Sequence, residues 1–104
     1  MQNRDMRKEQ RIDLISEVYY EVNRSEISAR WMDISKGGIF VHTMDPPSLG
    51  EQVKLRIQLA AGQKSYRAVG VVRHSLKWVG MGIEFTHLHP EARNQIDNLR
   101  AVCL

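Results

Sequence analysis

The sequence predicts one small β domain that ends in an amphipathic helix. Six short segments alternate apolar and polar side chains as strands do, and turn residues lie between them. After Pro90 the apolar residues recur instead at intervals of three and four, which is the period of a helix. Short strands of this number and spacing are typical of an antiparallel barrel or a closed sandwich.

The expected strands are rich in β-branched and aromatic residues. They are residues 14–24, 26–35, 38–43, 51–60, 64–74 and 77–85. The clearest alternation is that of Val53, Leu55, Ile57 and Leu59, which have polar residues between them. Gly70 is expected to mark a bend or bulge of the kind that small barrels use to close.

The two ends of the chain differ from this pattern. Pro90 suits the first turn of a helix and Glu91 suits its dipole, so we expect a helix over about residues 89–103 that packs on the barrel. Its apolar stripe consists of Ala92, Ile96, Leu99 and Cys103. Residues 1–13 have no strand periodicity, and we expect them to form a flexible arm ahead of a β domain at 14–104.

The composition indicates a soluble cytoplasmic protein. The 104 residues, 42% hydrophobic and 26% charged, are enough for one core. No apolar stretch approaches the roughly 18 residues that span a bilayer, and no signal-peptide pattern follows the charged N-terminus. Cys103 is the single cysteine, so no intrachain disulfide forms and we expect it to be buried. Membrane insertion is not expected.

Patterns of catalytic and metal-binding residues are missing from the sequence. His42, His74, His87 and His89 fall on three different elements, without acidic or thiol ligands at zinc spacing. There is no nucleophile elbow, P-loop or dinucleotide fingerprint. We therefore expect no enzymatic activity, no metal and no cofactor.

The positive charge is concentrated near the N-terminus. The chain has a net charge of +3, and four cations lie within eight positions: Arg4, Arg7, Lys8 and Arg11. In an extended segment Arg7 and Arg11 would face the same side, with α-carbons about 13 Å apart, so they could straddle a ligand of nucleotide size. Guanidinium groups fork onto phosphate oxygens or onto guanine O6 and N7. The alternative is a solvated charged arm.

The junction of the second and third strands, residues 33–38 with sequence DISKGG, is a second motif. It could be a simple hairpin turn in which the glycines take positive φ. It could also bind a ligand, because the Asp33 carboxylate can accept both the N1 and N2 protons of guanine. Ser35 would add a hydroxyl, and glycine would permit close approach of the backbone.

Taken together, the two motifs resemble those of the PilZ domain family. An RxxxR pair precedes the first strand, and a DxSxxG turn joins the second and third. The similarity continues through GGIFVHT, the proline-rich turn before EQVKLRI, the strand GMGIEF and the closing helix, and so extends over essentially the whole chain. The resemblance implies a six-stranded antiparallel β-barrel of bacterial origin that binds the second messenger cyclic di-GMP.

The resemblance also implies the ligand-binding residues. Arg7 and Arg11 would grip guanine edges and phosphates, while Asp33, Ser35 and Gly38 would form the floor of the pocket. The further candidates are Lys8, Lys36, Gly37 and Trp78. Trp31 and Trp78 are otherwise expected to pack in the core, as aromatic residues of strands usually do.

The expected function is that of a receptor that changes conformation when cyclic di-GMP binds and signals to a partner protein that the sequence does not identify. One alternative is an adaptor of the same fold that does not bind nucleotide. Another is a small basic barrel for RNA or single-stranded DNA, although the sequence has no evident aromatic platform for bases. Nucleic acid is therefore not the expected partner.

Overall fold

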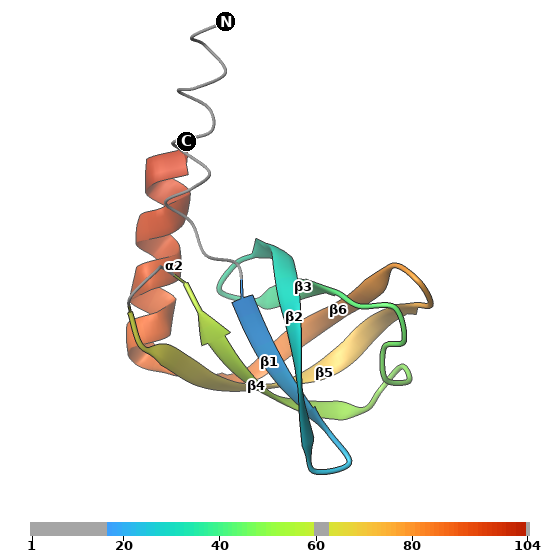
Figure 1. Cartoon of the computed structure of the whole chain (residues 1–104). Helices are drawn as coiled ribbons and strands as arrows, with labels where there is room; N and C mark the ends of the chain where they lie inside the picture. The colour runs from blue at the N-terminus through green and yellow to red at the C-terminus, as the bar shows by residue number, and fades with distance from the viewer. Residues whose placement is uncertain (1–16, 60–62, 104) are drawn as a thin grey trace, which may run out of the picture.

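The computed structural model describes residues 17–59 and 63–103, and within them the chain forms six strands and one helix. The elements are β1 (Glu17–Val22), β2 (Ser25–Ile34), β3 (Gly38–His42), β4 (Gln52–Gln58), β5 (Ser65–Leu76), β6 (Gly80–Leu88) and α2 (Pro90–Cys103). The strands close into a barrel in the order β1-β2-β3-β6-β5-β4, and all neighbours are antiparallel (Figure 1). The predicted six-stranded barrel with a C-terminal helix is confirmed. The arm expected at residues 1–13 lies outside the described residues.

The interior of the barrel contains the apolar residues that the alternation predicts. Val53, Leu55, Ile57 and Leu59 are all buried. The helix α2 lies at the end of the barrel away from the β5–β6 hairpin (Figure 1), and its Ala92 and Ile96 belong to the same core. Leu99 and Cys103 are the other members of the predicted stripe, and their side chains are outside the described part of the structure. The expected burial of Cys103 therefore stays a prediction.

Three register shifts bend the barrel. The shift at Gly70 was expected. The extra residue there belongs to the neighbouring strand β6 and is Thr86. The other two place one extra residue on β2, at Met32, and one on β5, at Arg73. Such bulges bend a strand and change the direction in which its side chains point.

The sixth strand begins later than the alternation predicts. The sequence favours a strand over residues 77–85, whereas β6 spans Gly80–Leu88. Residues 77–79 form a turn in which the Val79 amide donates to the carbonyl of Leu76 at 3.0 Å. Trp78 has a φ of 73° there, in the left-handed region that strands do not use. The strand-like composition of this segment is overridden because β5 continues to Leu76 and the chain must reverse.

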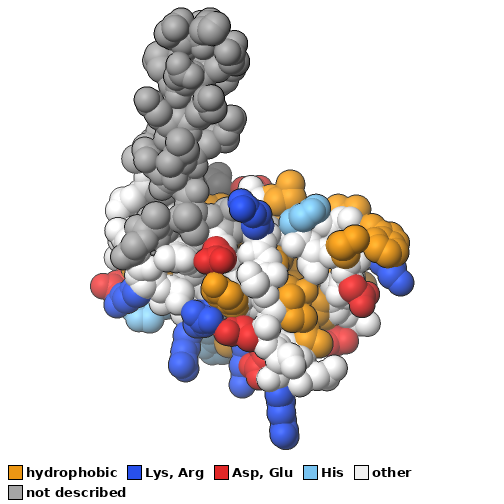
Figure 2. Space-filling model, viewed as in Figure 1, with side chains coloured by type: hydrophobic (Ala, Val, Ile, Leu, Met, Phe, Trp, Pro, Cys, Tyr) orange, Lys and Arg blue, Asp and Glu red, His pale blue; other side chains and the backbone are white. Residues whose placement is uncertain are grey.

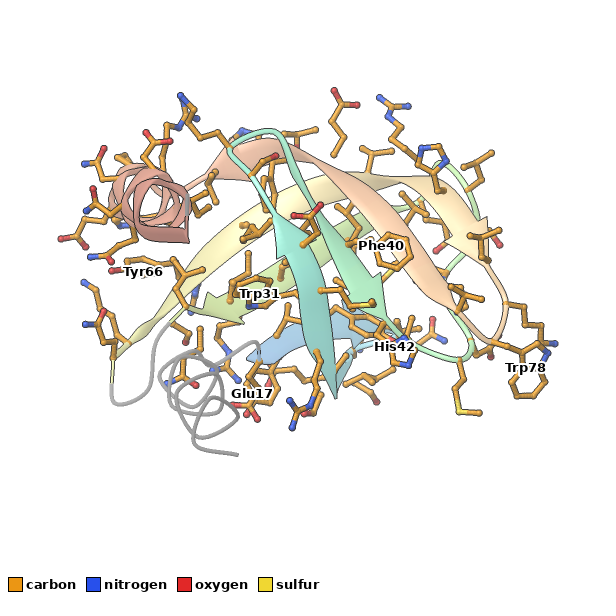
Figure 3. The ribbon with its side chains drawn as sticks, turned by 90° about the horizontal axis from the view of Figure 1, so that it is seen from above. Glu17, Trp31, Phe40, His42, Tyr66 and Trp78 are labelled. Atoms are coloured by element: carbon orange, nitrogen blue, oxygen red, sulfur yellow. The ribbon has the colours of Figure 1, made fainter. Side chains whose placement is uncertain are left out.

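The two tryptophans consequently have opposite environments (Figure 3). Trp31 is half-buried against the core, and its indole Nε1 donates to the carbonyl oxygen of Gln58 at 3.3 Å. Trp78 projects from the β5–β6 hairpin with 65% of its surface exposed. The prediction of core packing is confirmed for Trp31 and wrong for Trp78.

The hairpin end of the barrel carries an exposed apolar surface, visible at the right of Figure 2. Five of the exposed large hydrophobic residues of the described chain lie in or beside the β3–β4 and β5–β6 loops: Met44, Leu49, Leu76, Trp78 and Val79. The two loops are joined by a hydrogen bond from the Trp78 amide to the Met44 carbonyl at 2.7 Å. The barrel thus has an apolar end opposite α2.

Candidate functional site

The DxSxxG turn connects β2 to β3 and is closed by its own hydrogen bonds. The Ser35 amide donates to the carbonyl of Gly38 at 2.9 Å, and the Gly37 amide donates to the Ser35 hydroxyl at 3.3 Å. Asp33, the first residue of the motif, is still part of β2 and is exposed. Within the described residues its carboxylate makes no hydrogen bond or ion pair, so its acceptor oxygens face solvent.

The glycines of this turn do not take the positive φ of the simple hairpin alternative. Within the described residues, positive φ among glycines occurs only at Gly50 and Gly80, and not at Gly37 or Gly38. Gly38 instead lies against the neighbouring strand, where an added Cβ would stand 2.5 Å from the carbonyl oxygen of Ile83. Gly37 has open space, with the Ser35 hydroxyl the nearest atom at 4.0 Å. The close approach of β3 to β6 therefore explains why residue 38 is a glycine.

A hollow of about 310 Å³ opens on the barrel surface beside this turn. The strand order β2-β3-β6-β5 brings residues distant in sequence to its walls. Its lining includes Asp33, Ser35, Phe40, Arg73, His74 and Glu84. Four of the strands thus contribute to one concave site.

The lining of the hollow is largely apolar, and charged side chains of both signs stand around it. Asp33 and Glu84 contribute carboxylates, and Arg73 contributes a guanidinium. Arg73 Nε donates to Glu84 Oε1 at 2.7 Å, and both side chains are more than half exposed. His74 adds an imidazole that lies against Gly82 in the next strand. Such a surface offers a ligand both hydrogen-bond donors and acceptors.

The remaining predicted site residues are not all near this hollow. Lys36 extends from the turn toward α2, where its Nζ is 3.8 Å from Asp97 Oδ1. Trp78 lies at the other end of β3 and β6, because Gly80 pairs with His42 whereas Gly38 pairs with Glu84. Arg7, Lys8 and Arg11 lie outside the described residues. The structure thus brings together Asp33, Ser35, Gly37 and Gly38, and it adds Arg73, His74 and Glu84, which sequence reasoning missed.

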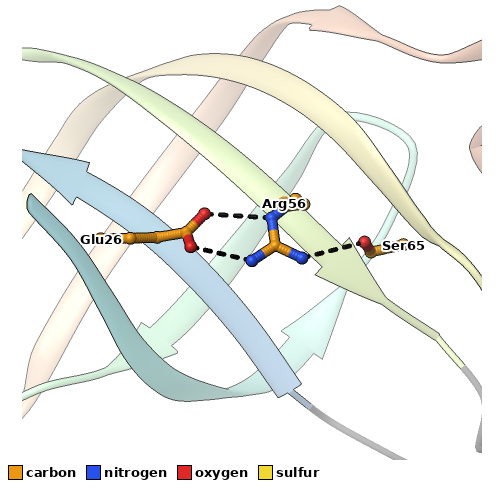
Figure 4. A network of polar contacts seen from close by, with 3 residues as sticks. All are labelled: Glu26, Arg56 and Ser65. Atoms are coloured by element: carbon orange, nitrogen blue, oxygen red, sulfur yellow. Dashed lines mark hydrogen bonds and ion pairs between the residues drawn. The ribbon is translucent and has the colours of Figure 1, made fainter. Parts of the chain in front are cut away.

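A second polar network lies on the outer face of β1, β2, β4 and β5 (Figure 4). Arg56 donates to both carboxylate oxygens of Glu26, at 3.0 and 2.8 Å, and to Ser65 at 3.3 Å. Its guanidinium also stacks over the Tyr19 ring, 4.4 Å from the centroid. The hydrogen bonds lower the pKa of Glu26 and raise the pKa of Arg56. Because each nitrogen of the Arg56 guanidinium has a strand partner and the guanidinium stacks on Tyr19, the network joins four strands across the barrel surface.

Two further properties concern metals and membranes. In residues 17–59 and 63–103, no three histidine, cysteine, aspartate or glutamate side chains are placed to share a metal ion. The same part of the chain contains no helix of the length and apolar character needed to cross a membrane.

Comparison with known protein families gives a match over nearly the whole chain. The sequence matches the PilZ domain over residues 5–101, a range that includes the RxxxR pair, the DxSxxG turn and most of α2. Comparison with curated proteins gives no match. The family is known as a cyclic di-GMP-binding domain. Since the match covers nearly the whole chain, the protein belongs to the PilZ domain family.

Proposed function

We propose that this protein is a non-catalytic receptor for cyclic di-GMP that acts in the cytoplasm and signals to a partner protein. The observation that carries the proposal is the position of the DxSxxG turn, which opens into a hollow with the Asp33 carboxylate unpartnered in the described residues. Membership of a family known for this ligand supports it.

The chemistry of the turn matches that of a guanine base. The Asp33 carboxylate can accept from guanine N1 and N2, and Ser35 supplies a half-buried hydroxyl beside it. Gly37 is exposed and has no side chain, so a planar base can approach its backbone. The turn would therefore recognise one guanine of the ligand.

The two arginines of the RxxxR motif would supply the complementary charge. Cyclic di-GMP has two phosphate charges and two guanines, and a guanidinium fork suits both groups. In this proposal the arm bearing Arg7 and Arg11 closes over the nucleotide when it binds. The ordered arm changes the surface that a partner protein meets, as a receptor without catalysis requires.

Isothermal titration with cyclic di-GMP tests the proposal, with GTP and cyclic di-AMP as controls. One bidentate arginine–guanine contact is worth about 1–3 kcal/mol, so Arg11→Ala should weaken binding roughly 5- to 150-fold. Arg67→Ala is the matched control, because Arg67 is an exposed arginine of β5 that does not line the hollow. Absence of binding by the unmodified chain would indicate an adaptor that does not bind nucleotide.

Hydrogen exchange tests the movement of the arm. Saturating cyclic di-GMP should slow exchange of the amides at residues 4–12, because an arm that covers the ligand loses contact with water. Unchanged exchange in that segment, with binding established by titration, would contradict closure of the arm.

A further inference from the structure

Arg73 lies at an irregularity of β5. Val72 pairs with Ile83 and His74 pairs with Gly82, so Arg73 is an extra residue without a partner in the register. Strand alternation would place Arg73 and His74 on opposite faces, yet both are exposed. The bulge therefore presents two consecutive side chains on the outside of the barrel, beside the hollow.

A matching bulge lies on the other side of the hollow. In β2, Trp31 pairs with Val41 and Asp33 with Phe40, so Met32 is the extra residue, and Asp33 is turned outward. The register then forms one row across four strands, from Asp33 through Phe40 and Gly82 to His74. Three strand spacings of about 4.8 Å separate the ends of this row by roughly 14 Å, the size of a nucleotide.

Arg73 is held in a defined orientation but keeps free donors. Its Nε donates to Glu84 Oε1 at 2.7 Å, which fixes one edge of the guanidinium. Within the described residues, its two Nη atoms have no hydrogen-bond partner. A guanidinium anchored by one nitrogen offers the other two as a preorganised fork for phosphate oxygens.

The exposed ion pair itself has little structural value. Arg73 and Glu84 side chains are 58% and 57% exposed, and ion pairs of this kind contribute little to stability because water screens them. Arg73 lies outside both motifs of the family resemblance, so neither motif accounts for its presence at the wall of the hollow.

We propose that Arg73 is a third ligand-binding arginine, which contacts a phosphate of the nucleotide from the wall opposite Asp33. The inference rests on the proposed function, since it assigns a residue to the same site. Asp33 reads a guanine at the β2 wall, and the Nη atoms of Arg73 donate to phosphate oxygens at the β5 wall, with Phe40 and Gly82 between them. Glu84 is a positioning residue that holds the guanidinium edge.

Titration of cyclic di-GMP into Arg73→Gln and Arg67→Gln variants tests this assignment. Both remove one positive charge from an exposed position of β5, and only Arg73 lines the hollow. A lost charge-assisted hydrogen bond to phosphate should weaken binding about 10- to 100-fold in Arg73→Gln. Affinity in Arg67→Gln should stay within about twofold of the unmodified chain, since charges beyond a Debye length of about 8 Å are largely screened at physiological salt.

The geometry of the guanidinium is tested by Arg73→Lys. This variant keeps the charge and loses the fork, so it should bind with an affinity between those of the unmodified chain and Arg73→Gln. Thermal unfolding should be nearly unchanged in both variants because the ion pair is exposed. A folded Arg73→Gln variant with unchanged affinity, or equal losses in Arg73→Gln and Arg67→Gln, would overturn the assignment.

The outcomes also separate this inference from the proposed function. If the unmodified chain binds cyclic di-GMP and only the role of Arg73 fails, the receptor function stands. If the unmodified chain binds no cyclic di-GMP, the receptor function fails, and the role of Arg73 fails with it.

Discussion

Gly38 lies so close to Ile83 that a Cβ on Gly38 would stand 2.5 Å from the Ile83 carbonyl oxygen. This contact sets the position of the DxSxxG turn against β6, where the Gly37 carbonyl also accepts from the Phe85 amide at 2.9 Å. Strand packing alone therefore requires a glycine at the last position of the motif, whether or not a ligand binds.

Substitution of the two glycines by alanine should affect the stability of the protein to different extents. Gly38→Ala forces the backbone of β3 or β6 to move, and overpacking of this kind costs about 1–3 kcal/mol. Gly37→Ala meets open space and should change the free energy of unfolding by less than about 1 kcal/mol. Urea unfolding of both variants measures the difference, and equal stability of the two would contradict the close approach of Gly38 to Ile83.

Trp78 should tolerate replacement, in contrast to Trp31. Trp78→Asn removes a bulky residue from a left-handed conformation that asparagine adopts readily, so stability should be unchanged or higher by up to about 1 kcal/mol. Trp31→Ala removes core packing and the bond to Gln58, and it should cost about 2 kcal/mol or more. Chemical denaturation checks both, and a large loss in Trp78→Asn would contradict its exposed position.

The bond between Glu26 and Arg56 should make stability depend on pH. The Arg56 hydrogen bonds hold the pKa of Glu26 below its ordinary value of 4.5. A carboxyl whose pKa is lowered by folding stabilises the protein above its ordinary pKa, and this contribution is lost as pH falls through the folded value. The unmodified chain should therefore be slightly more stable than Glu26→Gln at neutral pH.

Urea midpoints measured from pH 7 down to pH 3 follow this difference. It should shrink as the pH falls, and the effect should be small because both side chains are well exposed. A difference that grows in acid would contradict the ion pair.

His89 caps the helix α2. Its Nδ1 accepts from the Glu91 amide at 3.0 Å and satisfies one of the free N–H groups at the helix start. His89→Ala should cost about 0.5–2 kcal/mol, as loss of an N-cap does, whereas His89→Asn keeps an acceptor and should cost less. Thermal unfolding of the two variants distinguishes them, and identical losses would indicate that packing against the Tyr66 ring is the main contribution.

Much of the barrel follows from local sequence. Val53, Leu55 and Ile57 alternate with polar residues, and burial of one face decides their strand and its register. The turn between β5 and β6, expected at residues 75–76, could not be placed correctly this way, since residues 77–79 include strand-forming Trp78 and Val79 and no glycine or proline. Its position depends on how far β5 extends, which pairing with β4 and β6 determines.

The candidate site was predictable only where its residues are neighbours in the chain. Asp33 and Ser35 belong to one motif, so they could be proposed as guanine-binding residues from the sequence alone. Arg73 reaches the hollow because β6 lies between β3 and β5, and the bulge at Arg73 turns the next residue, His74, outward beside it. Neither the strand order nor the bulge can be predicted from residues 72–74, whose sequence is that of a regular strand.

The most direct test of the account is the location of bound cyclic di-GMP by NMR titration of the ¹⁵N-labelled protein. The amides of Ser35, Gly37 and Gly38 and the side chain of Arg73 should shift as ligand is added. The indole N–H of Trp78, at the opposite end of β3 and β6, should stay unchanged. Shifts confined to the Tyr19 and Arg56 face, or no shifts at saturating nucleotide, would contradict a receptor site at the DxSxxG turn.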